Sequence, residues 1–307
     1  MRPIVQKMEI PAGRRAVCIS DIHGSYNLLR ALLEKVGYCE ADMLILLGDL
    51  YTKGEQGQKT LSYIMELAGR EGVYILRGNC DWLEGWLTDA QREFLENLPH
   101  ILESRDFVFV HGGIASMDFE TLDAYACMKN DNFMETSQGF EKWVVTGHWP
   151  VHNYRHTICS NVPLVNADKH IIAIDGGNVV CRHGQLNAFI IQDGAFTYAS
   201  ADAHDAYTIP HAQAASGGTL NITYLDRFVE LVQEGTLFSQ VRHLATGRVL
   251  EVPNWSLWQD GQGRLGAGSG ATDYYPALQA GEKTSLIRRS GNRLLLLKDG
   301  VAGWYEE

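Results

Sequence analysis

The chain has 307 residues, 45% of them hydrophobic, a length that predicts one large domain and a small one. Its formal net charge is −11 and it has no cluster of Lys and Arg, which argues against binding to the phosphates of duplex nucleic acid. The first residues lack the apolar run of a signal peptide, and no stretch of about 18 apolar residues follows, so we expect a cytoplasmic protein without a membrane partner.

Short apolar runs rich in β-branched residues recur through the first two-thirds of the chain. Each is followed by polar residues, usually with a glycine, and such runs suit strands that are buried on both faces. The predicted strands cover residues 16–19, 43–47, 73–76, 107–110, 143–146 and 170–174.

Helical patterns lie between the first of these strands. Ser25 is a suitable N-cap for a helix whose leucines from 28 to 33 share one face, and Gly37 ends it. A second helical pattern covers residues 61–68. A third begins at Thr88, which has the capping-box spacing with Gln91. The alternation of strand and helix predicts an α/β fold for this part of the chain.

The composition changes after residue 199, and residues 209–219 are small and polar, which predicts a linker. We therefore predict a first domain in residues 1–212 and a second in residues 219–307. Asp299-Gly300 predicts a two-residue hairpin turn. The second domain is predicted to be a small all-β barrel, with strands at 220–232, 238–244, 248–252, 284–288, 294–298 and 301–305.

Each of the first five predicted strands ends at a side chain that can bind a metal ion. An open α/β sheet places its active site beyond the carboxyl ends of its strands. A set of carboxylates, an amide oxygen and imidazoles favours manganese, iron or zinc over magnesium or calcium. The candidate ligands are Asp21, His23, Asp49, Asn79, His111 and His148.

The ordered motifs D-x-H, G-D, G-N, H-G and G-H resemble those of the calcineurin-like metallophosphoesterases, over roughly residues 14–198. The resemblance implies a four-layer sandwich in which helices flank two packed mixed sheets. It also implies two divalent metal ions (Mn, Fe or Zn), bridged by Asp49, and a metal-bridging hydroxide as the nucleophile. The first ion would be held by Asp21, His23 and Asp49, and the second by Asp49, Asn79, His111 and His148.

Two motifs are most similar to those of bacterial serine/threonine phosphoprotein phosphatases, namely His111-Gly112-Gly113 and Gly147-His148-Trp149-Pro150. This likeness implies hydrolysis of a phosphomonoester, with a phosphoprotein or a small phosphoester as the substrate. Positive groups should complete the phosphate site, and Lys53 and Arg77 are the basic residues nearest to the motifs.

The chain departs from these phosphatases at the general acid. They carry G-D-x-x-D-R-G and G-N-H-E, where the Asp orients a His that protonates the leaving alkoxide, but Thr52 and Cys80 stand at those two positions here. Either the substrate has a better leaving group, or another residue donates the proton. We predict Asp81 as the substitute proton donor, so Asp49 and Asp81 are the predicted catalytic residues. His152 and His156 are further candidates for the proton donor.

Two other functions stay open. The G-N-C-D form of residues 78–81 resembles small phosphodiesterases, which predicts a substrate that is a cyclic nucleotide or a dinucleotide. The missing acid also suits a catalytically weak protein that binds phosphate or acts as a scaffold. Residues 295–305 resemble bacterial Src-homology-3-like barrels, which implies a peptide partner for the second domain.

Overall fold

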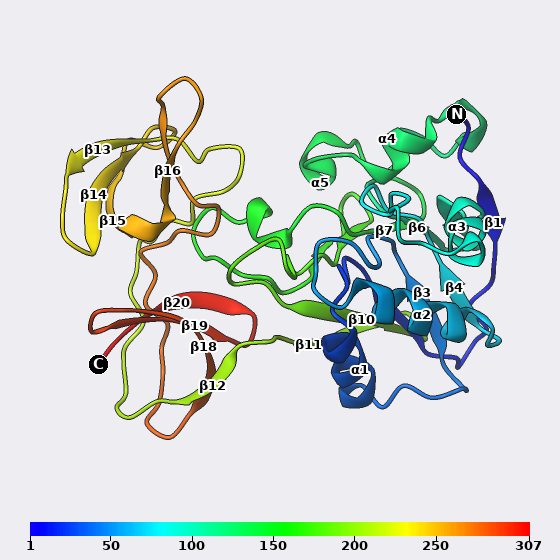
Figure 1. Ribbon diagram of the computed structural model, residues 1–307, viewed down its shortest axis with the longest axis horizontal. Helices are drawn as coiled ribbons and strands as arrows, with labels where there is room; N and C mark the ends of the chain where they lie inside the picture. Colours follow the sequence, from blue (N-terminus) through cyan, green and yellow to red (C-terminus); the bar gives the residue numbers. More distant parts are fainter. The chain divides into compact units, whose positions relative to one another are not determined.

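The computed structural model describes residues 1–307, which group into two compact units (Figure 1). The N-terminal unit comprises Met1–Val151, Pro163–Val180 and Gly184–Asp202. The C-terminal unit comprises His152–Val162, Cys181–His183 and Ala203–Glu307. The division into domains at 212 and 219 stays a prediction. None of the helices has the length and apolar character that crossing a membrane requires.

The N-terminal unit contains two mixed sheets. In the five-stranded sheet, with the order β11-β10-β2-β3-β4, the strands β2, β3 and β4 are parallel and β10 is antiparallel to β2. Its strands are β2 (Ala16–Ile19), β3 (Met43–Leu46), β4 (Val73–Ile75), β10 (Leu186–Gln192) and β11 (Ala195–Ala201).

The six-stranded sheet has the order β1-β5-β6-β7-β9-β8, and β6, β7 and β9 are parallel. Its strands are β1 (Val5–Lys7), β5 (Ile101–Glu103), β6 (Phe107–Val110), β7 (Trp143–Thr146), β8 (Leu164–Asn166) and β9 (Ile171–Ala173). The α/β class is therefore confirmed, and all six strands predicted in this part of the chain form.

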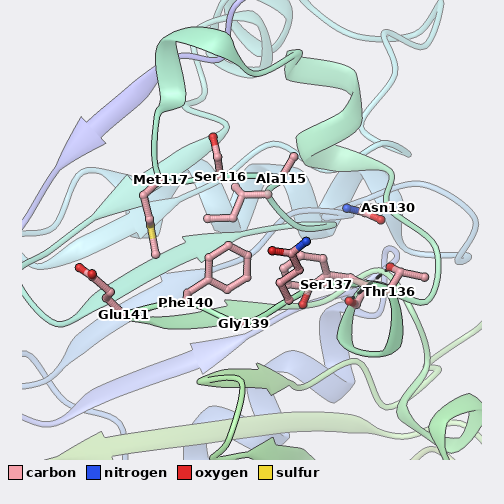
Figure 2. Close-up of a pocket in the computed structure, with 12 residues that line it drawn as sticks. Ala115, Ser116, Met117, Asn130, Thr136, Ser137, Gly139, Phe140 and Glu141 are labelled. Carbon is pink, nitrogen blue, oxygen red and sulfur yellow. Dashed lines mark hydrogen bonds between the residues drawn. The ribbon is translucent and has the colours of Figure 1, made fainter.

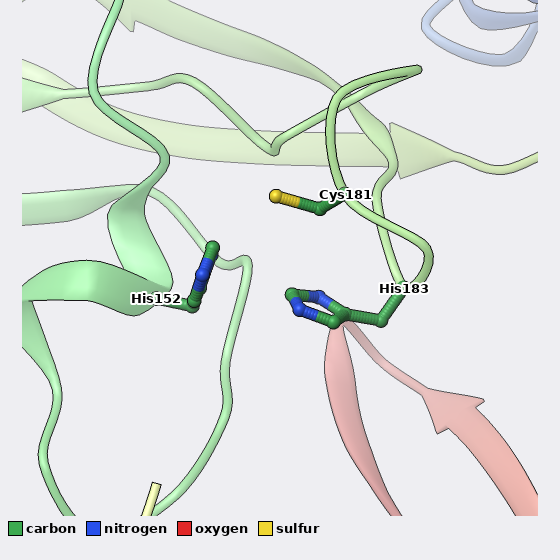
Figure 3. Close-up of side chains that lie close together, drawn as sticks. All are labelled: His152, Cys181 and His183. Carbon is green, nitrogen blue, oxygen red and sulfur yellow. The ribbon is translucent and has the colours of Figure 1, made fainter. Parts of the chain in front are cut away.

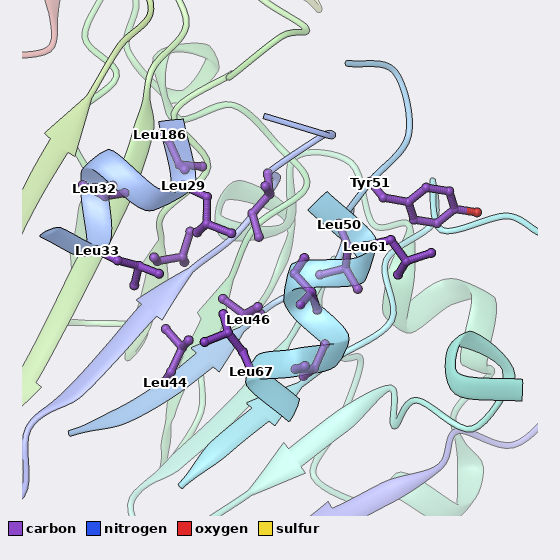
Figure 4. Close-up of a cluster of buried hydrophobic side chains, with 14 of the residues drawn as sticks. Leu29, Leu32, Leu33, Leu44, Leu46, Leu50, Tyr51, Leu61, Leu67 and Leu186 are labelled. Carbon is purple, nitrogen blue, oxygen red and sulfur yellow. The ribbon is translucent and has the colours of Figure 1, made fainter. Parts of the chain in front are cut away.

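Two apolar cores hold these layers together. One joins the facing sides of the two sheets, where Cys18 and Ile45 of one sheet pack in the same cluster as Phe109 and Val145 of the other. The second core lies on the other side of the five-stranded sheet, under the first three helices of the chain (Figure 4). The helices are α1 (Tyr26–Lys35), α2 (Gly57–Ala68), α3 (Asp89–Glu96), α4 (Ala124–Met128) and α5 (Phe133–Thr136), with 3-10 turns η1 (Phe119–Thr121) and η2 (Val151–Tyr154).

Ser25 precedes α1, but its side chain makes no capping hydrogen bond, whereas the other two helix signals act as the sequence predicts. The leucines of α1 are buried and the helix ends before Gly37, which has a left-handed φ of 59°. At the start of α3, Thr88 Oγ accepts the backbone N–H of Gln91, and the Gln91 side chain accepts the backbone N–H of Thr88. The capping box is therefore confirmed, and such a cap contributes about 1 kcal/mol.

The C-terminal unit is all β, but its strands pair in three separate sheets of four, three and two strands. The predicted closed barrel is therefore not confirmed. The Asp299-Gly300 turn is confirmed, since both residues have positive φ and join paired strands. The strands are β12 (Asp205–Thr208), β13 (Val229–Gln233), β14 (Phe238–His243), β15 (Val249–Pro253), β16 (Leu257–Gln259), β17 (Leu265–Ala267), β18 (Lys283–Ser290), β19 (Arg293–Lys298) and β20 (Val301–Glu306), with the 3-10 turn η3 (Asn254–Ser256).

Two segments of this unit differ from the prediction. The strand predicted at 220–232 forms only as β13, because Asp226 Oδ1 accepts the N–H and the hydroxyl of Thr223 and so holds a turn. The segment predicted as a linker is packed: Ile209 is buried, and Gln213 and Leu278 exchange backbone hydrogen bonds of 3.0 and 2.9 Å.

Candidate metal centre

Four of the six predicted ligands have left-handed backbone conformations. The φ angles are 57° at Asp21, 46° at His23, 53° at Asp49 and 63° at His148. Such conformations cost on the order of 1–3 kcal/mol each for a residue with a side chain, and they concentrate at functional sites. Here each follows a strand, where the sharp turn directs the side chain beyond the end of the sheet.

The structure brings the six side chains together inside the N-terminal unit. Ligand atoms of Asp21, Asp49 and His111 all lie within 4.8 Å of one another. His23 Nε2 lies 3.8 Å from Asp21 Oδ1 and 3.6 Å from Asp49 Oδ2. His111 Nε2 lies 3.2 Å from Asp49 Oδ1 and 3.1 Å from Asn79 Oδ1.

His148 joins the group through its backbone and its ring. Its N–H donates to Asp21 Oδ2 at 2.9 Å, and its imidazole lies 5.4 Å from that of His111, between ring centres. Its Nε2 contacts Asp131 Oδ1 at 2.7 Å. The sequence analysis missed Asp131, because this acidic residue stands in a polar loop with no motif around it.

The hydrogen bonds of His111 leave one of its nitrogens for a ligand. Nδ1 lies 2.6 Å from the carbonyl oxygen of Leu47, so it donates its proton there. Nε2 therefore directs its lone pair at Asp49 and Asn79 when the ring is neutral.

Two buried carboxylates in this group require positive charge. Burial alone would raise the pKa of Asp49, yet the neighbouring His111 ring holds it well below the usual range. Burial alone would lower the pKa of His111, yet the carboxylates of Asp49 and Asp21 raise it to about 10. The Nδ1 of His23 is also buried and has no hydrogen-bond partner. Divalent cations would meet both needs, and the nitrogen and oxygen donors suit them.

Glycines allow the ligand loops to approach each other. A Cβ on Gly147 would lie 1.8 Å from Ser20 Oγ and 2.4 Å from Asp21 Oδ2, and Ser20 Oγ itself donates to Asp21 Oδ2 at 2.6 Å. A Cβ on Gly78 would lie 2.2 Å from Asp49 Oδ1. The loops at these two positions therefore accept only glycine without displacing a candidate ligand.

The residues that replace the usual general acid touch each other. Thr52 Oγ1 donates to the carbonyl of Cys80 at 2.7 Å. Burial raises the pKa of the Cys80 thiol to about 12, so the thiol is neutral and a poor proton donor. The neighbouring Asp81 is buried, and its carboxylate accepts three backbone N–H groups, those of Asp49, Leu50 and Gly78.

Two of the other candidate residues, Lys53 and Arg77, lie around the same loops. Burial alone would lower the pKa of Lys53, but a hydrogen bond with Cys80 and the carboxylate of Asp49 raise it. Arg77 Nη2 donates to the carbonyl of Asp81 at 3.5 Å. His152 and His156 belong to the C-terminal unit. Burial lowers the pKa of His152 well below its usual value, so this ring carries no proton to donate at neutral pH.

A cavity of about 660 Å³ is lined by residues that follow the His111-Gly112-Gly113 motif in the sequence, among them Ala115, Ser116 and Met117 (Figure 2). Its lining begins at Ile114 and includes Asn130 and Phe140. Gly112 packs tightly against the lining residue Asn130, since a Cβ on Gly112 would lie 2.8 Å from the backbone nitrogen of Asn130. The lining residue Ile114 directly follows the His111-Gly112-Gly113 motif. The lining residue Asn130 directly precedes Asp131, which contacts the candidate ligand His148.

Comparisons with known proteins agree with this geometry. Residues 14–182 match the family described as calcineurin-like phosphoesterase. The chain is 32% identical over 121 residues to the symmetrical bis(5′-nucleosyl)-tetraphosphatase of Pseudomonas fluorescens, covering 32% of this chain and 41% of that protein. It is 42% identical over 64 residues to the protein of the same name from Buchnera aphidicola, covering 20% of this chain and 23% of that protein. The chain therefore spans less than half the length of these relatives.

A solved structure shows the same fold. A protein serine/threonine phosphatase from Saccharomyces cerevisiae superposes with a TM-score of 0.50 at 14% identity, over 68% of this chain and 86% of that chain. The family match extends over more than half of the sequence and includes all five strand-end loops, which carry the six candidate ligands. The chain therefore belongs to the calcineurin-like phosphoesterase family.

Proposed function

We propose that this protein hydrolyses a substrate with a good leaving group, and specifically the phosphoanhydride of a dinucleoside polyphosphate. The observation that carries the proposal is the environment of Cys80, where a neutral and buried thiol stands in place of a proton donor. A nucleoside phosphate leaves as a stable anion, whereas the alkoxide of serine needs a proton as it departs.

The six candidate ligands would hold two divalent metal ions. When bound, such ions supply Lewis acidity to the phosphate oxygens and activate a water molecule. The chain's own residues position these groups. Asp81 fixes the loops of Asp49 and Asn79, and Asp131 orients the ring of His148. Lys53 and Arg77 are the proposed phosphate contacts, and each supplies a charge near the ligand loops.

The cavity lined by Asn130 and Phe140 supports a nucleotide as the substrate. Phe140 offers an aromatic face and Asn130 an amide with both donors and an acceptor, which together suit a nucleobase. The named activity of the two bacterial relatives is in keeping with this choice of substrate.

The second candidate is a phosphomonoesterase of the serine/threonine phosphatase type. The His111-Gly112-Gly113 and Gly147-His148-Trp149-Pro150 motifs support it. In that case Asp81 would be the substitute acid, but its two oxygens already accept three backbone N–H groups, which favours a positioning role.

A substrate panel with manganese separates these functions. It would compare diadenosine tetraphosphate, bis-p-nitrophenyl phosphate, p-nitrophenyl phosphate and a phosphoserine peptide. We expect kcat/KM to be highest for the tetraphosphate and about 10² lower for the phosphoserine peptide. A phosphoserine peptide that is cleaved as fast as the tetraphosphate would favour the second candidate. Bound manganese without turnover of any substrate would show a phosphate-binding or scaffold protein instead.

The variant Asp49→Asn makes the panel specific to the candidate centre. We expect it to lower every rate at least about 100-fold, because it replaces a buried carboxylate that contacts His23 and His111 with a neutral amide. Asp168→Asn, at an exposed position, is the matched control and should behave as the wild type. A cytoplasmic location and a peptide partner for the C-terminal strands remain proposals from the sequence.

A further inference from the structure

A second group of metal-binding side chains lies within the C-terminal unit. His152, Cys181 and His183 come from two segments that are far apart in the sequence, yet their ligand atoms all lie within 4.8 Å of one another. Figure 3 shows the three side chains pointing toward a common space. The two imidazole rings are nearly perpendicular, at 87°, with centres 4.6 Å apart.

The hydrogen bonds around His152 fix which nitrogen carries its proton. Asn153 Oδ1 accepts the backbone N–H of Tyr224 at 2.9 Å and the hydroxyl of Ser269 at 2.8 Å. Ser269 Oγ has thereby used its only proton, so at 2.7 Å from His152 Nε2 it must accept from that nitrogen. His152 Nδ1 is consequently the unprotonated nitrogen.

That unprotonated Nδ1 is buried and has no hydrogen-bond partner. A buried lone pair without a donor is costly, and about 1–3 kcal/mol is typical for such a group. Metal-binding histidines share this arrangement. One ring nitrogen donates its proton in a hydrogen bond, and the other nitrogen keeps a lone pair for the ion.

His183 differs from His152, because its ring already has hydrogen-bond partners. Its ring makes a hydrogen bond to the backbone of Ser269, and its Nδ1 lies 3.2 Å from the amide nitrogen of Asn161, which can only donate. Nδ1 is therefore the unprotonated nitrogen, and an ion bound there would replace the Asn161 N–H as its partner. Burial lowers the pKa of His183 to about 4, so both imidazoles are neutral at physiological pH and can act as ligands.

We propose that His152, Cys181 and His183 bind a zinc ion that is distinct from the candidate metal centre and has a structural role in the C-terminal unit. Nitrogen and sulfur donors together select zinc over magnesium, calcium or manganese. The candidate metal centre contains no sulfur donor, so the two sites differ in the ions that they prefer.

Cys159 is our candidate for the fourth ligand. Structural zinc sites take four nitrogen or sulfur ligands, and the buried Cys159 Sγ lies 3.7 Å from both ring nitrogens of His183. The two thiolates would neutralise the double positive charge of the ion. A neutral site is favoured here because an uncompensated charge is costly where solvent exposure is low. The ion would then tie the segments His152–Val162 and Cys181–His183 to each other.

Cobalt substitution tests the proposal on the full chain. Co²⁺ bound to a thiolate gives a charge-transfer band in the near ultraviolet, whereas Co²⁺ bound only to nitrogen and oxygen does not. We expect one equivalent of Co²⁺ to give this band in wild type and in Asp49→Asn, and one equivalent of Zn²⁺ to abolish it. A wild-type protein that binds cobalt without the band would overturn the proposal, whatever the variants do.

Variants assign the band to this site. Cys181→Ser should remove most of it, and His183→Asn should weaken cobalt binding at least 10-fold. Cys39→Ser, at an exposed cysteine, and Cys80→Ser, beside the candidate metal centre, should retain the band. Loss of the band in Cys80→Ser but not in Cys181→Ser would overturn the proposal. So would a Cys159–Cys181 disulfide, detected by mass spectrometry, in protein purified without reductant. An unchanged band in Cys159→Ser would overturn the fourth ligand alone.

Discussion

The carboxylate of Asp81 accepts a hydrogen bond from the backbone N–H of Asp49, at 2.9 Å. The same carboxylate accepts the N–H groups of Leu50 at 2.7 Å and Gly78 at 2.8 Å. One buried side chain thus fixes two loops that each carry a candidate ligand, Asp49 and Asn79. This relationship separates a positioning role for Asp81 from a role as proton donor.

Asp81→Asn should lower activity by about 10- to 100-fold through weaker metal binding. The new amide directs N–H groups at backbone N–H groups, so we also expect a loss of about 1–3 kcal/mol in the free energy of unfolding. A titration of activity against manganese measures the effect, and excess manganese should restore part of the rate. A rate that manganese does not restore, with alkyl substrates affected far more than aryl ones, would make Asp81 the acid. Asp89→Asn, at an exposed position, is the control.

Gly147→Ala should abolish most of the activity while leaving the fold intact. The added Cβ would meet Ser20 Oγ and Asp21 Oδ2, so Asp21 must move away from its place among the candidate ligands. We expect a destabilisation of about 1–3 kcal/mol, as for other overpacked sites. Chemical denaturation and kcat measured on one substrate would show both effects. Gly85→Ala, where nothing lies within 4 Å of the added Cβ, should change neither.

The pair Arg15 and Asp42 predicts a pH dependence of stability. Arg15 Nε and Nη2 donate to the two oxygens of Asp42 at 2.9 and 2.6 Å, and this pairing holds the pKa of Asp42 below its ordinary value of 3.8. A depressed carboxyl pKa stabilises the folded state fully above the unfolded value, and the effect disappears as the pH falls through the folded value.

We therefore expect Asp42→Asn to lower the free energy of unfolding by about 2 kcal/mol at pH 7, and by progressively less below pH of about 4. Urea denaturation at several pH values gives the comparison. Asp106→Asn breaks an exposed pair with Arg105 and should have no measurable effect at any pH. A difference between wild type and Asp42→Asn that grows toward acid pH would contradict the assignment.

Restoring the missing acid should change the choice of substrate. Thr52 and Cys80 are in contact, so Thr52→Asp with Cys80→His places an Asp beside a His. We expect kcat on a phosphoserine peptide to rise by about 10² relative to kcat on diadenosine tetraphosphate, because only the alkoxide needs the proton. Thr52→Asp alone should give no gain. An equal change on both substrates would mean that proton donation does not limit either reaction.

Much of the fold follows from the sequence, because local signals decide it. Buried strands such as β2 and β6 read as uninterrupted apolar runs, and Thr88 fixes the start of its helix through its own side chain. The pairing of β10 with β2 could not be predicted, since it joins Phe189 to Cys18 across most of the N-terminal unit. The predicted barrel was not confirmed, and the reason is similar: each hairpin of the C-terminal unit forms between neighbouring segments, whereas closing a barrel requires pairing between distant strands.

The candidate centre was predictable because each of its side chains directly follows an apolar run. Residues that support those side chains carry no such signal. Asn178, for example, donates through its side chain to the carbonyl of Ile22 at 2.9 Å from a distant loop. The group at His152 and His183 lacks the paired spacing by which zinc sites are found, since only folding brings its segments together.

The C-terminal unit is discontinuous in sequence, and this affects how the protein is made. Its first segments, His152–Val162 and Cys181–His183, leave the ribosome long before Ala203–Glu307 is synthesised. Until then they have no final packing partners, and the buried imidazoles of His152 and His183 remain in water. A truncation after Asp202 would leave both segments without these packing partners. A protein that contains only residues 1–202 should therefore be less soluble than the whole chain.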